Sequence, residues 1–136
     1  DLVTGVQTCA LPIYHPLASA SKQGYSYAGD GIFGRIMRYL VCDSADIWLA
    51  GHSHHLEHRE EPGCGAAILI SGGGGGDVKA VNTDDPNSRF IRSQLGYSEL
   101  SISPDQLKIS FLDADNRILY QNSKTKGAVN ASLKNP

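Results

Sequence analysis

The sequence predicts a layered α/β domain with a mixed sheet that ends in an antiparallel meander. The pattern over 32–42 is that of an amphipathic helix, and the short apolar segments 46–50 and 66–71 end at glycines, as buried strands do. Apolar and polar residues alternate in three runs between 97 and 122. The chain has 136 residues, of which 40% are hydrophobic, so it has the length of one domain and can bury a core.

The first element in chain order is a loop over 15–31, which is rich in serine, glycine and alanine. The helix over 32–42 follows, and Asp30 is its predicted N-cap. The apolar positions of this helix recur at spacings near three and four: Ile32, Phe33, Ile36, Leu40 and Val41.

The strand over 46–50 delivers the chain to Gly51, and the strand over 66–71 runs into five consecutive glycines. Residues 81–90 are polar and turn-forming, so we expect an exposed excursion there. The antiparallel meander then uses three alternating strands, over 97–103, 106–113 and 117–122. A polar tail over 123–136 ends the chain.

The composition narrows the class of protein. The formal net charge is −2, and no basic stripe points to nucleic acid. No run of 18 apolar residues exists to span a bilayer. Outside the first residues the cysteines are Cys42 and Cys64, which lack a CxxC spacing. They are either one disulfide, if the protein is exported, or two separate core residues.

The first residues resemble a processing scar. Val3–Ile13 matches the in-frame translation of a common sequencing adapter, so we expect residues 1–13 to be an adapter-derived artefact that is left out of fold reasoning. The adapter's last T would begin codon 14, and the native residue at Tyr14 would then be His, Asn, Asp or Tyr. The alternative is a genuine N-terminal strand.

Four of the five histidines follow one apolar strand, at His52, His54, His55 and His58. Gly51 permits a tight turn at the end of that strand. Two residues spaced i, i+2 in a turning loop can face one centre or two adjacent ones. Neutral imidazole is the commonest side-chain metal ligand, and open α/β sheets place ligands at the carboxyl ends of their strands. The pattern therefore favours a metal site over an incidental polar loop.

These residues carry a family resemblance. "WLAGHSHHLEH" resembles the Gly-His-x-His signature of the calcineurin-like metallophosphoesterases, most closely that of tartrate-resistant and purple acid phosphatase-like members. "YHPLASASKQG" is similar to the family's His-x-Pro segment, and "LISGGGGG" to the strand after the histidine signature. Residues 95–126 resemble the closing meander. The four pieces lie in family order over 14–126.

The resemblance implies the C-terminal half of a four-layer α/β/β/α sandwich that holds two metal ions, of iron, zinc or manganese. His52 would bind one ion and His54 the other. The His-x-Pro histidine, a ligand of the same ion as His52, falls on Tyr14, so the native residue there is expected to be His. His15 would be the variable middle residue, although a shift of one position would make it the ligand.

The sequence also departs from the family. The upstream signatures Asp-x-His, Gly-Asp-x-x-(Asp/Tyr) and Gly-Asn-His are absent, so most metal ligands are missing and we predict that the chain as written is inactive. Gln23 stands where several relatives have a substrate-contacting His. His55 is a weak candidate for substrate or outer-shell contact, with exposure preferred, and His58 is expected in a surface charge cluster. Asp77 is not expected to be a ligand.

Two further features have structural interpretations. The glycines at 72–76 lack the Gly-Lys-(Ser/Thr) ending of a phosphate loop, so we expect close backbone approach there instead. Trp48 is expected in the core.

The resulting prediction is a fragment of a secreted or periplasmic phosphoesterase that hydrolyses small phosphate esters by two-metal activation of water. Its organisation is an artefact over 1–13, the half-domain over 14–126 and a flexible tail over 127–136. The alternatives are a mononuclear zinc hydrolase and a non-catalytic β-rich binding module.

Overall fold

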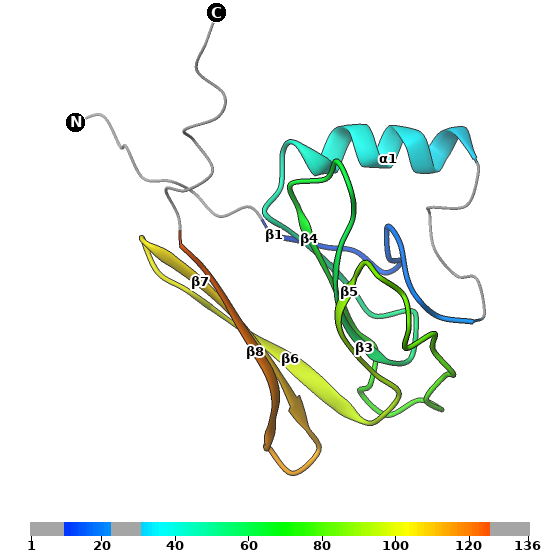
Figure 1. Cartoon of the computed structure of the whole chain (residues 1–136), viewed down its shortest axis with the longest axis vertical. Coiled ribbons are helices and arrows are strands. Elements are labelled where there is room, and N and C mark those ends of the chain that lie inside the picture. The colour runs from blue at the N-terminus through cyan, green and yellow to red at the C-terminus, as the bar shows by residue number, and fades with distance from the viewer. Residues whose placement is uncertain (1–9, 23–30, 126–136) are drawn as a thin grey trace, which may run out of the picture.

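The computed structural model describes residues 10–22 and 31–125 (Figure 1). Within these ranges a helix, a five-stranded sheet and a three-stranded sheet form three layers. This is the α/β/β part of the predicted sandwich. The elements have these bounds: β1 Ala10–Pro12, α1 Ile32–Cys42, β2 Ile47–Ala50, β3 Leu56–Glu60, β4 Ala67–Ser71, β5 Ser88–Arg92, β6 Gly96–Ile102, β7 Gln106–Asp113 and β8 Ile118–Thr125.

The larger sheet is mixed, with the strand order β1-β2-β4-β3-β5. Strands β1, β2 and β4 are parallel, whereas β3 runs antiparallel to both of its neighbours. The smaller sheet is the meander β6-β7-β8, antiparallel throughout. The predicted antiparallel C-terminal meander is confirmed, and its strands β6–β8 form a separate sheet that packs against the first.

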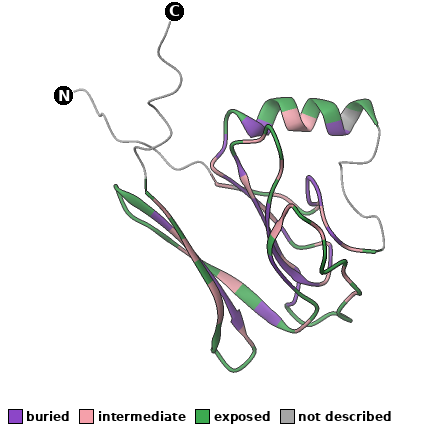
Figure 2. Cartoon of the chain, in the orientation of Figure 1, coloured by how far each residue is buried: buried purple, intermediate pink, exposed green. Residues whose placement is uncertain are grey.

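Side-chain alternation along the central strands divides the core into two clusters. Trp48 and Ile68 face the helix side, where they pack with Val41 and Leu17. Leu69 faces the other way and belongs to the cluster that the second sheet completes. Figure 2 shows the buried residues gathered along these central strands, whereas most of the helix surface drawn is exposed. The predicted core position of Trp48 is confirmed, because its side chain is fully buried.

The helix has its predicted bounds, but two details differ. Its N-cap is Gly31, with no side-chain cap, instead of Asp30, which lies outside the described residues. The predicted apolar face is largely exposed: Ile32 is 79%, Ile36 47% and Leu40 54% accessible. Of the predicted face, Val41 is buried, and the helix packs through it together with Met37 and Cys42.

The strands β2 and β4 and the three meander strands confirm the predicted segments. The sequence analysis missed β3 and β5. Residues 82–84 are exposed as expected for the excursion at 81–90, but its last part is the start of β5. In the described part of the chain, no helix is long and apolar enough to cross a membrane. The predicted tail lies mostly outside the described residues, although β8 extends to Thr125.

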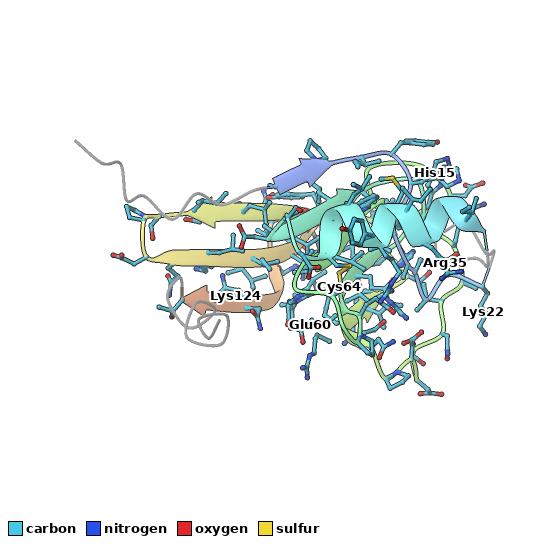
Figure 3. The ribbon with its side chains drawn as sticks, turned by 90° about the horizontal axis from the view of Figure 1, so that it is seen from above. His15, Lys22, Arg35, Glu60, Cys64 and Lys124 are labelled. Carbon is cyan, nitrogen blue, oxygen red and sulfur yellow. A yellow bond between two sulfur atoms is a disulfide. The ribbon has the colours of Figure 1, made fainter. Side chains whose placement is uncertain are left out.

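A disulfide joins Cys42 at the end of α1 to Cys64 in the turn between β3 and β4, which settles the open pairing. The bond appears in yellow beside Cys64 in Figure 3. The same two segments share a backbone hydrogen bond, from Gly65 N to the Cys42 carbonyl at 3.0 Å. The helix is thus tied covalently to the sheet at the end where it packs.

Removing the disulfide should weaken the fold. The cysteines are 22 positions apart, and closing a loop of this size restricts the unfolded chain, so C42A/C64A should lower the free energy of unfolding by roughly 2–4 kcal/mol. Urea denaturation under non-reducing conditions measures the difference. A reductant should destabilise the original chain and leave C42A/C64A unchanged; equal stability of the two oxidised proteins would contradict the expectation.

Candidate metal centre

The loop over residues 51–55, which we call the histidine loop, begins where β2 ends, beside the end of β1. The Tyr14 carbonyl accepts hydrogen bonds from Gly51 N at 3.3 Å and from His52 N at 3.0 Å. These bonds continue the parallel pairing of β1 with β2 by two further residues. Because the carboxyl ends of parallel strands lie at one edge of a sheet, the two sequence-distant segments meet there.

The side chains at this edge form an aromatic cluster. The ring centroid of His52 lies 4.2 Å from that of His15 and 4.6 Å from that of Tyr14. The indole N–H of Trp48 donates to the His15 carbonyl at 3.1 Å, so the buried core also fixes this segment. The structure therefore brings together the predicted positions 14, 15 and 52.

The electrostatics of the cluster favour neutral imidazole. Burial lowers the pKa of His52, and the neighbouring His15 and His54 lower it further. A lowered imidazole pKa keeps a ring nitrogen lone pair available at neutral pH, which is the form that binds a metal ion.

The glycine-rich segment, residues 72–77, orients His54. Its Nδ1–H donates to the backbone carbonyl of Asp77 at 3.1 Å, which leaves Nε2 as the nitrogen with a lone pair. The backbone N–H of Lys79 donates to the His54 carbonyl at 2.9 Å. Asp77 thus contributes its main chain in this contact.

The glycines allow the backbone approach that the sequence analysis expected. A Cβ at Gly72 would lie 1.9 Å from the Ser53 carbonyl oxygen and 2.6 Å from that of Gly51. A Cβ at Gly76 would lie 2.5 Å from Cε1 of His54. The glycine-rich segment therefore packs directly against the histidine loop, and it can do so only without side chains at these positions.

The two remaining histidines of the motif are buried, His55 directly before β3 and His58 within it, and the predicted exposure of both was wrong. His55 is 0% and His58 1% accessible. Strand β3 is paired on both sides, and its charged residues Glu57, His58 and Arg59 are enclosed instead of solvated. A run of charged residues is typical of a surface, and the partners that allow these to be buried lie far along the chain.

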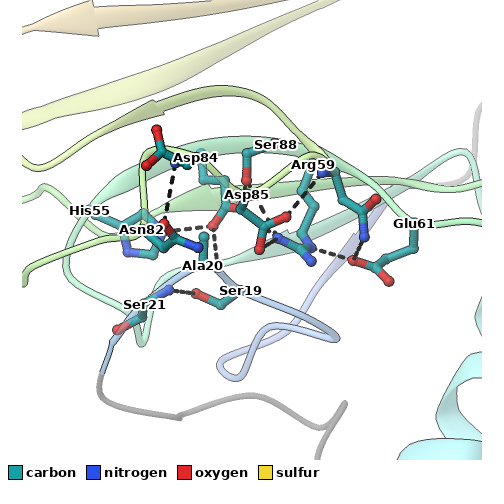
Figure 4. Close-up of polar contacts among 12 residues, drawn as sticks. Ser19, Ala20, Ser21, His55, Arg59, Glu61, Asn82, Asp84, Asp85 and Ser88 are labelled. Carbon is teal, nitrogen blue, oxygen red and sulfur yellow. Dashed lines mark hydrogen bonds and ion pairs between the residues drawn. The ribbon is translucent and has the colours of Figure 1, made fainter.

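Glu57 is the centre of a buried polar network on the helix side of β3, and Figure 4 labels its partners Ala20, His55, Arg59 and Ser88. Its Oε2 accepts from His55 Nε2 at 2.8 Å and from Ala20 N at 3.1 Å. Its Oε1 accepts from Ser88 Oγ at 2.5 Å and from Arg59 Nη1 at 3.3 Å. These four donors satisfy a carboxylate that is inaccessible to solvent. No sequence signal identified this network.

Hydrogen bonding decides the charge of Glu57. Burial alone would raise the pKa of its carboxyl, but the bonds from His55, Ser88 and Ala20 outweigh burial and lower it. Burial lowers the pKa of Arg59, and Asp85 and Glu61 raise it above its ordinary value. Arg59 pairs with Asp85 at 2.9 Å and with Glu61. The network is therefore ionic at neutral pH.

His58 points to the other face of β3, between the two sheets. Its Nδ1 is hydrogen-bonded to Tyr120 Oη at 3.1 Å, and its Nε2 lies 4.0 Å from a Glu60 oxygen. A cavity of about 690 Å³ lies beside it, between β3, β4 and the meander. His52 and His54 do not line this cavity, which marks it as separate from the histidine loop. Figure 3 likewise separates His15 from Lys124, which does line the cavity.

The donor chemistry fits part of a metal centre. Two imidazoles at a strand end suit zinc or iron, whereas manganese prefers oxygen ligands in addition. Among residues 10–22 and 31–125 there is no group of three or more His, Cys, Asp or Glu side chains arranged to hold a metal ion. These residues would therefore complete a centre only together with further ligands.

The fold of the described residues is similar to that of a known class of proteins. The described part of the chain has the fold of the C-terminal part of a calcineurin-like metallophosphoesterase, and the resemblance seen in the sequence is confirmed.

The particular relatives are purple acid phosphatases and a protein with a similar fold. No family model matches the chain. Purple acid phosphatase 3 of Arabidopsis thaliana is 26% identical over 117 residues, covering 82% of this chain and 31% of the relative. The structure of purple acid phosphatase PPD1 from yellow lupin (Lupinus luteus) seeds has a TM-score of 0.69 at 17% identity, over 87% of this chain and 25% of that one.

GAP50, the anchor in the inner membrane complex of Plasmodium, has a TM-score of 0.69 at 18% identity. The match covers 82% of this chain and 34% of GAP50. The chain thus spans about a third or less of the length of these relatives.

Substituting Gly72 should separate the glycine-rich segment from the histidine loop. In Gly72→Ala the new methyl group would overlap the Ser53 carbonyl, so we expect a loss of roughly 1–3 kcal/mol of stability and shifted imidazole NMR signals of His52 and His54. Gly74→Ala is the matched control, because no heavy atom lies within 4 Å of its Cβ position. Equal behaviour of the two variants would contradict this packing.

The protonation of His58 should lower the free energy of unfolding as the pH falls. Burial lowers its pKa from the ordinary value of 6.5, with Glu60 opposing and Arg89 adding to the shift. The unfolded state then binds a proton near pH 6.5 that the folded state refuses, so the free energy of unfolding declines as the pH falls below that value. Urea denaturation at pH 7.5, 6.5 and 5.5 should give a smaller decline in His58→Gln. Identical declines would exclude His58 as a source.

Proposed function

We propose that this chain is the C-terminal half of a metal-dependent phosphoesterase, whose parent hydrolyses small phosphate esters by two-metal activation of water. The observation that carries the proposal is the meeting of position 14 with His52 at one sheet edge, beside His54. The similarity to purple acid phosphatases supports the same class of reaction.

The residues take distinct parts in this proposal. His52 and the native residue at position 14, which we propose to be His, would hold one ion, and His54 would hold the other through Nε2. The bound ions would supply a hydroxide nucleophile at moderate pH and a clamp for the phosphoryl oxygens. His15, whose ring contacts that of His52, would limit the space beside it.

The chain as written is proposed to be inactive, because Tyr14 replaces a ligand and the carboxylate ligands of the family are absent from its sequence. In the same proposal residues 1–13 are an adapter-derived artefact and residues 127–136 a tail. Export of the parent is supported by the Cys42–Cys64 disulfide, since such bonds persist in oxidising compartments.

The test uses the parent protein, expressed from the source DNA that continues upstream of codon 15. His52→Ala and His54→Ala should each lower kcat/KM for p-nitrophenyl phosphate by more than about 100-fold. Losing a residue that only hydrogen-bonds to a metal ligand typically costs roughly 10–100-fold, and each of these variants removes a direct ligand. His58→Gln, on the other face of β3, is the control and should stay within a few-fold.

The proposal fails if the parent lacks the Asp-x-His, Gly-Asp-x-x-(Asp/Tyr) and Gly-Asn-His signatures, or if both alanine variants keep full activity. The 136-residue chain itself should show no turnover with added zinc, manganese or iron. A natural Tyr at position 14 with the same residues before it would instead favour a non-catalytic binding module, in line with the absence of a three-ligand cluster among the described residues.

A further inference from the structure

We propose that Glu57 is the positioning residue of the histidine site: its buried carboxylate holds the segment that follows His15 and the loop that carries His52 and His54 in a fixed relation. The effect on catalysis rests on the proposed function, whereas the bridge itself is formed by residues of this chain.

One carboxylate oxygen joins the two segments. Oε2 of Glu57 accepts from Ala20 N, five residues after His15, and from His55 Nε2, one residue after His54. The two donors therefore share one acceptor atom, at 3.1 and 2.8 Å. A displacement of either segment would lengthen one of these bonds.

The other oxygen prevents the carboxylate from turning. Oε1 accepts from Ser88 Oγ, which belongs to β5, and from Arg59 Nη1, which belongs to the same strand as Glu57, β3. Arg59 is itself held by Asp85 and Glu61. The bridging oxygen is thus aimed by partners that lie outside the His15 segment and the histidine loop.

Stability alone is a weak reason for a charged group here. Enclosing a carboxylate costs free energy, and buried ionic groups are often no more stabilising than apolar residues of similar volume. What a carboxylate provides is direction, because charge-assisted hydrogen bonds are short and geometrically selective. The neighbouring cores use apolar residues, whereas this position of β3 is ionic.

A second connection runs in parallel and limits the expected effect. Ala20 also accepts from Asn82 N at 2.9 Å, and His54 accepts from Lys79 N at 2.9 Å, so the segment between 79 and 82 links the same two parts. Loss of Glu57 should therefore loosen the relation between the rings and leave the fold intact.

The chain offers a matched pair of variants. Glu57→Gln keeps the shape but places an amide NH₂ where one acceptor stood, facing donors on both sides. Glu61→Gln removes a carboxylate from the same Arg59, and the side-chain bonds of Glu61 go to Arg59, Arg38 and Asn87, which lie outside both segments. Any difference between the variants thus reports the bridge and not the general loss of an ion pair.

The measurement is NMR on the full 136-residue chain with labelled histidine and alanine. The original chain should show nuclear Overhauser contacts between the His15 and His52 rings, whose centroids are 4.2 Å apart, and a downfield Ala20 amide signal. In Glu57→Gln these contacts should weaken at least twofold and the Ala20 signal should move upfield. Glu61→Gln should retain both. A merely stabilising role would lower the unfolding temperature and leave the ring contacts of the folded chain unchanged, which would overturn the proposal.

A second variant covers the case in which Glu57→Gln does not fold. His55→Phe keeps Glu57 and its bonds to Ala20, Ser88 and Arg59 but removes the link to the histidine loop. It should likewise weaken the contacts between the His15 and His52 rings, and retained contacts would overturn the proposal.

An activity assay on the parent protein tests the effect of Glu57 on catalysis. Glu57→Gln should lower kcat/KM for p-nitrophenyl phosphate by about 10–100-fold, as for other outer partners of metal ligands, and Glu61→Gln by no more than a few-fold. A parent without phosphatase activity would refute the proposed function, while the NMR contacts would still decide the role of Glu57. An active parent whose Glu57→Gln and Glu61→Gln variants behave alike would refute the positioning role alone.

Discussion

The structure depends on one constraint, which is that β3 is enclosed on both faces and both edges while it carries a carboxylate and a guanidinium. Glu57 and Arg59 can be enclosed only because partners from distant segments satisfy them. This requirement brings the loop after His15 and the turn before β5 onto the helix-side face of the sheet. The histidine loop, which leads directly into β3, is held at the point where those segments converge.

Elements whose stability comes from local pattern could be predicted from the sequence. The helix over 32–42 and the meander strands follow from apolar spacing and turn residues, and they lie where expected. Strands β3 and β5 could not, because their sequences, LEHRE and SRFIR, are rich in polar residues, and their pairing partners lie in other strands of the sheet. The exposed apolar face of α1 shows the same limit, since periodicity marks a helix but not the side on which it packs.

The histidine site was predictable to the extent that a short motif reports it. The Gly-His-x-His after an apolar strand marked His52 and His54, and the parallel neighbour brings position 14 beside them. The burial of His58 was not predictable, because it follows from pairing on both sides of β3. The burial of His55 and its bond to Glu57 could be found only by knowing that the strand carrying Glu57 is central.

The pairing of β1 with β2 uses main-chain atoms, and it sets which of two adjacent rings stands closest to the histidine loop. Main-chain pairing accepts almost any extended sequence, so the identity of residues 10–12 matters less than their alignment with residues 47–49. Sliding β1 by one residue would place the carbonyl of His15 opposite Gly51 and turn each side chain to the opposite face. The choice between Tyr14 and His15 at this edge is therefore a property of strand register.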